Sequence, residues 1–240
     1  MDLGYHIDTQ KSMKVHSRHS VLSFNMDISL KREGYIKHFA SSILTLSQFP
    51  MRDYLIRSAF HQTILKTAHE CGDTFVVDEL GLKNGSYRAD IAVLNGKLIG
   101  YEIKTDSDNL IRLPNQIKAY NEVFDNAYII VGKKHIRCVE DMLPEWWGIY
   151  LIEDLAFEQY SFKVVRKAKK NYTIDSFGLA QLLWKNEVAE ILTSSFNYFV
   201  SSRTTKEELY DILSFECSPK KLSAFVHTYL KSRQSWRINL

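Results

Sequence analysis

The chain has 240 residues, of which 45% are hydrophobic and 12% aromatic, enough for a real core in one domain with additions or in two small ones. Charged residues make up 25% and the net charge is +3, which excludes a highly charged disordered chain and leans only weakly toward acidic partners. No apolar run approaches the roughly 18 residues that span a bilayer, and the N-terminus lacks a signal-peptide pattern. We therefore predict a cytoplasmic protein without a membrane partner.

Cysteine usage is consistent with that compartment. The three cysteines lie far apart and form no C-x-x-C pair: Cys71, Cys138 and Cys217. This spacing argues against a zinc ribbon and against an iron–sulfur cluster held by four thiolates. Three unpaired thiols fit a reducing environment.

The N-terminal part, residues 1–50, is predicted to be an arm followed by a helix. Residues 1–32 are polar and poorly periodic, whereas 34–48 carry an apolar stripe at helical spacing, which Pro50 interrupts. A second helix is predicted from about Arg52 to Glu70, with Gly72 at a position typical of a helix cap.

The apolar period then changes to that of strands, which we predict at 75–77, 87–94 and 98–104. A helix over about 114–124 follows, with a proline in its first turn, and then a short buried strand at 127–131. Two more strands are expected near 148–152 and 162–166. This helix–strand–strand–strand–helix–strand order predicts an α/β core with a mixed central sheet over residues 51–170. From Ser176 onward the spacing is helical, so 171–240 is predicted to be a helical C-terminal region.

Two neighbouring predicted strands carry the residues of a candidate phosphodiester-cleaving site. Hydrolysis of a phosphodiester needs carboxylates to hold metal ions and a positive group to serve the attacking water or the developing charge. Glu102 and Lys104 are two apart on one strand, so they share a face and lie roughly 6–7 Å apart along the chain. Asp90, on the preceding strand, would supply the second carboxylate.

The hairpin between these strands decides whether Asp90 faces Glu102. A two-residue turn at Asn95-Gly96 would pair Asp90 with Tyr101 and point the two carboxylates to opposite faces. A three-residue loop, Leu94-Asn95-Gly96, would pair Val93 with Lys97 and set Asp90 opposite Gly100, on the Glu102 face. We predict this loop or another bulge of equal effect.

The arrangement resembles the PD-(D/E)xK nuclease superfamily, on Asp90 followed by Glu102-Ile103-Lys104 in the element order given above. The resemblance covers about residues 52–132 and implies a restriction-endonuclease-like core. It implies Mg²⁺ or Mn²⁺ held by Asp90, Glu102 and the carbonyl of Ile103, with Lys104 serving the water and the transition state. Ala89 stands where the motif's name has a proline.

Two further features sharpen the resemblance. Gln116 and Tyr120, four residues apart on the following helix, share one face and look like the Q-x-x-x-Y signature of the RecB-like branch, which places them near the site and the DNA. The string GYEIKTDSDNLIRLPNQIKAYNEVFD is similar to a bacterial family known only as PD-(D/E)xK-like. Related nucleases often carry an extra upstream acidic residue. Glu79 is assigned that metal or water role, with Asp78 as its competitor.

Ordinary structural roles explain some of these residues as well. By spacing alone, Asp90, Glu102 and Lys104 fit a solvated strand face with a cross-strand ion pair, and Glu79 is an even choice between the two roles. His69 is a minor candidate for an extra metal ligand. The basic run from Lys163 to Lys170 is a candidate for phosphate contacts, which lysines protecting an edge strand explain almost as well.

We therefore expect a Mg²⁺- or Mn²⁺-dependent nuclease whose substrate is DNA. Its expected setting is DNA processing, restriction or defence against phage. Its first rival is a catalytically silent nuclease fold used for DNA binding or assembly. Its second is a DNA-binding regulator that uses the C-terminal helices. That C-terminal region is also the expected surface for a second copy of the chain or for a protein partner.

Overall fold

The computed structural model describes residues 53–155 and 159–233. The predicted N-terminal helix at 34–48 lies outside the described residues. None of the described helices is long and apolar enough to cross a bilayer.

The described chain begins with two helices, α2 (Asp53–Thr63) and α3 (Lys66–Glu70), where the sequence predicts one. At the break, the backbone N–H of Leu65 donates to the carbonyl of Phe60 at 3.0 Å, one residue further back than in an α-helix. This wider turn accompanies a Leu65 side chain that is only 3% exposed. The predicted single helix is therefore wrong at this point, because core packing favours the break.

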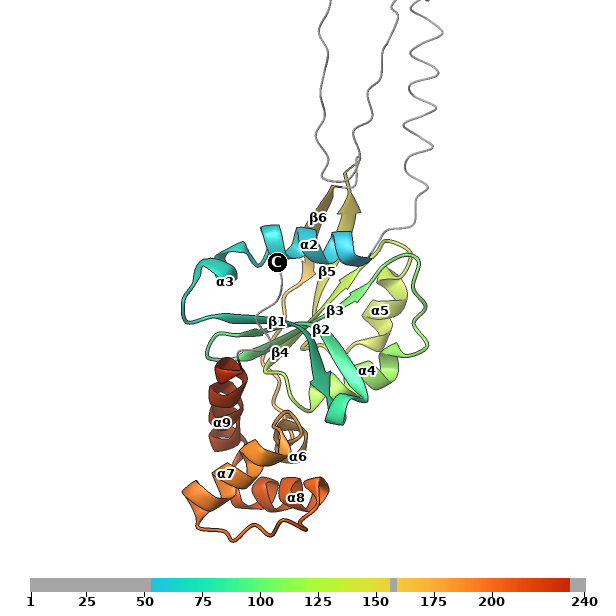
Figure 1. The fold of residues 1–240 in the computed structure, drawn as a ribbon. Helices are drawn as coiled ribbons and strands as arrows, with labels where there is room; N and C mark the ends of the chain where they lie inside the picture. Colours follow the sequence, from blue (N-terminus) through green and yellow to red (C-terminus); the bar gives the residue numbers. More distant parts are fainter. Residues whose placement is uncertain (1–52, 156–158, 234–240) are drawn as a thin grey trace, which may run out of the picture. The chain divides into compact units, whose positions relative to one another are not determined.

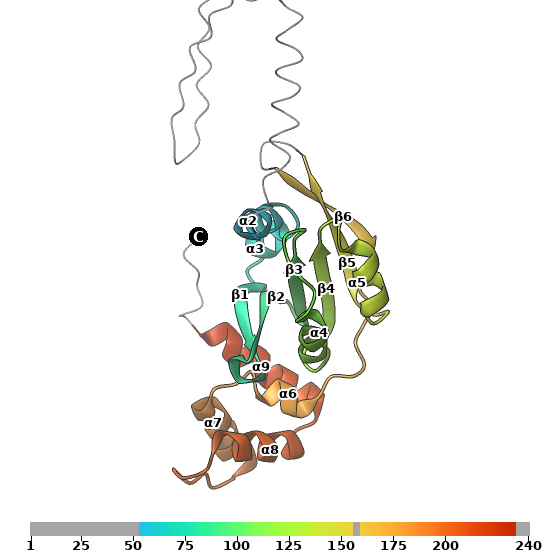
Figure 2. The same cartoon turned by 90° about the vertical axis from the view of Figure 1, so that its right-hand side faces the viewer.

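The described strands form one six-stranded mixed sheet in the order β1-β2-β3-β4-β5-β6 (Figures 1 and 2). Strand β2 is antiparallel to both of its neighbours, β1 and β3. Strands β3, β4 and β5 are parallel, and β6 is antiparallel to β5. The predicted α/β class with a mixed sheet is confirmed. The bounds are β1 (Phe75–Leu82), β2 (Tyr87–Leu94), β3 (Leu98–Lys104), β4 (Asn126–Val131), β5 (Gly148–Asp154) and β6 (Tyr160–Arg166).

Three short connecting elements complete this part of the chain. The helix α4 (Leu113–Asn121) lies between β3 and β4, and α5 (Ile136–Met142) between β4 and β5. A 3₁₀ turn, η1 (Lys83–Gly85), joins β1 to β2. The helix α5 was not predicted. Ile136, Val139 and Leu143 follow helical spacing and contact the core, but the seven residues of the helix are fewer than such a pattern needs to be recognised.

Helices cover both faces of the sheet. On one face, α2 and the α2–α3 turn bring Ile56, Phe60 and Leu65 onto apolar side chains of β2, β3, β4 and β5. On the other face, α4 and α5 pack against a larger core that continues into the C-terminal helices. Figure 1 shows α2 lying across one side of the sheet, with α4 and α5 away from α2. The site residues of β2 and β3 therefore lie in a covered sheet.

The C-terminal region is helical, as predicted, and its four described helices gather at one end of the sheet (Figure 2). They are α6 (Ser176–Ala180), α7 (Lys185–Phe196), α8 (Lys206–Glu216) and α9 (Pro219–Ser232). Thr205 and Glu208 form a reciprocal cap that begins α8. A buried ion pair between Arg233 and Glu187, with N···O distances of 2.9 and 2.5 Å, joins the end of α9 to the start of α7.

Candidate functional site

The β2–β3 hairpin sets the geometry of the site. Leu94 pairs with Leu98, so the loop has three residues, Asn95-Gly96-Lys97, and Gly96 takes the left-handed conformation with φ +84°. The predicted pairing of Val93 with Lys97 is wrong, because Val93 pairs with Ile99. The loop is nevertheless odd in length. One residue beyond the last pair, Ile91–Tyr101, Asp90 therefore falls across from Glu102 instead of Gly100.

The regular alternation of side chains reverses at Asp90. Ala89 and Ala92 both belong to the core on the α4 face, although an odd spacing should place them on opposite faces. The partner strand reverses at the same level, since Val77 and Leu80 also lie in that core. The β1–β2 pairing passes from Asp78–Ile91 to Leu80–Ala89 and omits the two residues between.

This interruption frees the Asp90 carboxylate to bond to the next strand. Its Oδ2 accepts a hydrogen bond from the backbone N–H of Ile103 at 2.6 Å, at the level where the β2–β3 pairing has ended. A side chain of β2 thus replaces a backbone acceptor. The carboxylate lies beside the Glu102-Ile103-Lys104 segment as a result.

Glu102 is the buried centre of the cluster, with 1% of its surface exposed. Its Oε1 accepts from the Lys104 ammonium and from the Gln116 amide, and its Oε2 accepts from the Tyr120 hydroxyl at 2.7 Å. The Lys104 ammonium also contacts the carbonyl oxygen of Ile103 at 3.2 Å. One carboxylate therefore gathers all the polar residues that were predicted on β3 and on the following helix.

Helix α4 can supply Gln116 and Tyr120 because it lies close to β3. A Cβ atom built on Gly100 would lie 2.6 Å from the ring of Phe124, so glycine allows this close approach. Both side chains are buried, and the Tyr120 hydroxyl also lies 3.1 Å from the Tyr101 carbonyl oxygen. Among the described residues, the Gln116 Oε1 atom is buried without a hydrogen-bond partner.

The electrostatics of the cluster are unbalanced toward negative charge. Burial, followed by the nearby Glu102 charge, raises the pKa of Asp90 to about 7, against the opposing effects of the Ile103 N–H, Lys104 and Arg57. Burial and the charges of Glu102 and Asp90 also raise the pKa of Tyr120, which keeps its hydroxyl protonated as a donor. A positive charge added beside Asp90 and Glu102 would lower the energy of their ionised forms.

Glu79 joins the cluster through an arginine. Its carboxylate lies 2.7 Å from Arg57 Nη1 and 3.6 Å from Arg88 Nε, and its φ is +57°, a conformation unusual for a residue other than glycine. Asp78, the alternative acidic residue, contacts a different residue of α2. It contacts His61 Nε2 at 3.0 Å, and His61 Nδ1 contacts His69 Nε2 at 2.9 Å.

Arg57 is the residue of this cluster that the sequence reasoning missed. Its Nη1 donates to the Asp90 carbonyl oxygen at 3.2 Å, and its Nη2 lies 3.4 Å from Asp90 Oδ1. A signal was present in the sequence, since Arg57 and His61 are four residues apart and border the apolar stripe of Ile56 and Phe60. Charged residues at the border of a buried stripe are candidates for contacts with the strands beneath.

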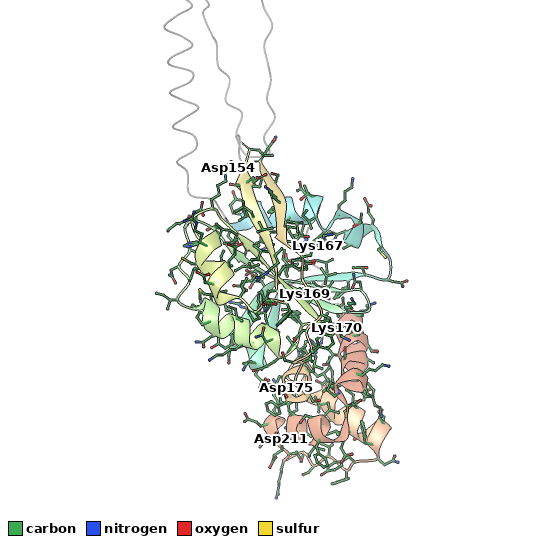
Figure 3. The ribbon with its side chains drawn as sticks, turned by 180° about the vertical axis from the view of Figure 1, so that it is seen from behind. Asp154, Lys167, Lys169, Lys170, Asp175 and Asp211 are labelled. Carbon is green, nitrogen blue, oxygen red and sulfur yellow. The ribbon has the colours of Figure 1, made fainter. Side chains whose placement is uncertain are left out.

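The basic run lies apart from the acidic cluster. Lys167, Lys169 and Lys170 follow β6 in the segment that leads to α6 (Figure 3). The backbone N–H of Lys169 donates to the Trp146 carbonyl oxygen, just before β5, whereas Glu102 and Lys104 lie toward the C-terminal end of β3. Because β3, β4 and β5 are parallel, these three lysines lie toward the opposite end of the sheet from the carboxylates. Lys163, at the start of the run, instead pairs with Leu151 toward the end of β5, three strands away from Lys104.

Comparison with known proteins places the chain in a phage family. The family model described as bacteriophage P4 protein cII matches residues 47–238. The chain belongs to the bacteriophage P4 protein cII family. A curated relative, protein cII of Enterobacteria phage P4, is 27% identical over 161 residues, which cover 67% of this chain and 60% of that protein. The chain thus matches less than two thirds of that relative's length. No solved structure matches.

Proposed function

We propose that this member of the P4 cII family is a metal-dependent nuclease with a restriction-endonuclease-like core of the PD-(D/E)xK type. The observation that carries the proposal is the pair of carboxylates, Asp90 and Glu102. Lys104 pairs with Glu102, whereas Arg57, which pairs with Asp90, is shared with a third carboxylate, Glu79. A fold without chemistry gains nothing from this charge imbalance, because it raises the energy of the ionised pair. A site for a cation and a phosphate uses it directly.

The donor set fits Mg²⁺ or Mn²⁺. Within residues 53–155 and 159–233, no three His, Cys, Asp or Glu side chains are grouped so that they could hold a metal. Asp90 and Glu102 with the Ile103 carbonyl offer oxygen ligands only, and Mg²⁺ is characteristically held by one or two carboxylates, water and substrate phosphate. When bound, such an ion polarises the phosphate and lowers the pKa of a coordinated water.

The chain's own residues then have distinct tasks. Tyr120 and Gln116 hold Glu102 in one orientation by donating to both of its oxygens. The Ile103 N–H holds one carboxylate oxygen of Asp90, and the other oxygen lies near Arg57. Lys104, 12% exposed, lies beside Glu102 and the Ile103 carbonyl, where its ammonium can stabilise negative charge that develops on a phosphate. DNA is the substrate we propose.

The test is cleavage of linear, circular, single-stranded and structured DNA, with RNA beside them, in Mg²⁺ or Mn²⁺ and in chelator. Wild-type protein should cut at least one substrate only when a metal is present. Lys104→Ala should lower that rate by about 10²–10³-fold with the fold intact, whereas Lys118→Ala, an exposed lysine on α4, should leave it unchanged. Absence of cleavage across all substrates and metals, with no metal binding, would favour a silent fold that binds DNA or serves assembly.

A further inference from the structure

We infer that Arg57 is a positioning residue that holds Asp90 in place for the cation, an inference that rests on the proposed function. Arg57 lies on α2, 33 residues before Asp90, and contacts both interrupted strands. Its Nη1 meets Glu79 of β1 at 2.7 Å and the Asp90 carbonyl of β2 at 3.2 Å. Its Nη2 meets the Asp90 carboxylate at 3.4 Å.

The interruption of the β1–β2 pairing makes these contacts necessary. At that level the strands lack the pair that Glu79 and Asp90 would form, and Glu79 has φ +57°. A buried carbonyl without a partner and a strained backbone each raise the energy of this conformation. The guanidinium donates to that carbonyl and to the side chain of the strained residue, so it stabilises the backbone from which the Asp90 carboxylate reaches Ile103.

The planar fork of arginine suits this task. Arg57 places two nitrogens in fixed positions, one for Glu79 and the Asp90 carbonyl and the other for the Asp90 carboxylate, with Asp53 3.5 Å from the second. A lysine ammonium is a single point charge and cannot occupy both positions. Glu79 accordingly acts on the site through Arg57. It orients the guanidinium, and the guanidinium orients Asp90.

The other arginine on Glu79 differs in a useful way. Arg88 Nε lies 3.6 Å from Glu79, but its side chain is 67% exposed, against 15% for Arg57. An exposed ion pair of this kind contributes little. Both arginines therefore place positive charge near Glu79, whereas the guanidinium that is mostly buried and reaches Asp90 belongs to Arg57.

The experiment removes the ion pair without changing the net charge near the cation. The double variant Arg57→Gln/Glu79→Gln loses one positive and one negative group. The matched control, Lys83→Gln/Glu122→Gln, removes a second ion pair, 2.6 Å long, between η1 and the end of α4. Mn²⁺ affinity is measured from the electron paramagnetic resonance signal of free Mn²⁺, with circular dichroism as the check of the fold. Cleavage gives kcat and KM separately.

The Arg57→Gln/Glu79→Gln protein should bind Mn²⁺ about 10- to 100-fold more weakly, as is typical when a residue that orients a metal ligand is lost, and its kcat should fall more than its KM changes. The control should stay within about twofold of wild type. Arg57→Lys keeps the positive charge and leaves Glu79 in place but loses the planar guanidinium, so its Mn²⁺ affinity should also fall. This variant tests the role of Arg57 if the double variant does not fold.

Unchanged or tighter Mn²⁺ binding by the folded double variant would overturn the role of Arg57. Unchanged binding by Arg57→Lys would overturn it where the double variant is unfolded. Both results leave the proposed function standing, provided that wild-type protein binds Mn²⁺ and Asp90→Asn does not. If wild-type protein binds no Mn²⁺, or if Asp90→Asn binds it equally well, the proposed function itself fails.

Discussion

Two clusters of buried charge in this chain differ in their balance. In the helical region, Glu187 and Arg233 face each other as one acid and one base, and the arginine also donates to the Leu182 carbonyl. In the sheet, three acids, Asp90, Glu102 and Glu79, pair with two mostly buried bases, Lys104 and Arg57, while the exposed Arg88 lies beside Glu79. The first cluster is complete in itself and joins two helices. The second would gain from one more cation, and for that reason we propose it as the reactive site.

The balanced pair should matter for stability and not for the reaction. Arg233→Met leaves Glu187 buried without its partner, which should lower the free energy of unfolding by about 3–5 kcal/mol. Chemical denaturation measures the loss, and Mn²⁺ affinity of the folded fraction should not change. The matched double variant Glu187→Met/Arg233→Met should recover most of the stability. A large loss of Mn²⁺ affinity in either folded protein would remove the distinction between the clusters.

In the acidic cluster, removal of a charge should stabilise the folded protein instead of destabilising it. The folded pKa of Asp90, about 7, lies above its ordinary value, so the folded state binds more protons than the unfolded chain between about pH 4 and 7, and stability falls as pH rises through that range. Asp90→Asn removes the charge and keeps an acceptor for Ile103. At pH 8, without metal, it should raise the free energy of unfolding by about 2–4 kcal/mol. A destabilised Asp90→Asn protein would contradict the assigned burial and repulsion.

The same pKa sets the pH dependence of metal binding. A proton on Asp90 competes with the cation, so Mn²⁺ affinity should rise about tenfold per pH unit below pH 7 and level off above it. Calorimetric titrations from pH 5.5 to 8.5 measure this curve. An affinity that does not vary over this range would show that Asp90 is not a ligand.

The smallest expected effect concerns the hydrogen bond from α4. Tyr120→Phe removes the donor to Glu102 Oε2 without changing the shape of the core, and should cost about 1.5–3 kcal/mol of stability, since the acceptor is charged. Mn²⁺ affinity should fall by a few fold, because Glu102 loses one of its supports. An unfolding curve and a Mn²⁺ titration on the same protein separate the two effects.

The sequence predicted which residues come together in the candidate site more accurately than it predicted the geometry of the hairpin that carries them. The alternation in β3 placed Glu102 and Lys104 together, and the helical spacing placed Gln116 with Tyr120. The odd hairpin loop was expected, but its position was off by one residue because turn chemistry does not distinguish Leu94 from Lys97 as the third loop position.

Contacts distant in sequence were beyond the reach of the patterns. The reversal of alternation at Asp90 depends on β1 and β2 together, so the spacing within one strand could not reveal it. Arg57 was missed for the same reason, since its partners lie on strands more than 20 residues later. The break before α3 is set by packing, which overrides local preference.

The most direct test of the account is the effect of Mn²⁺ on stability at pH 8, in wild type and in Asp90→Asn. A ligand at 100 times its dissociation constant stabilises the folded state by about 2.7 kcal/mol. We predict a shift of that kind in wild type and none in Asp90→Asn, although the variant is the more stable protein without metal. An equal shift in both proteins, or no shift in wild type at millimolar Mn²⁺, would contradict the assignment of the acidic pair as a cation site.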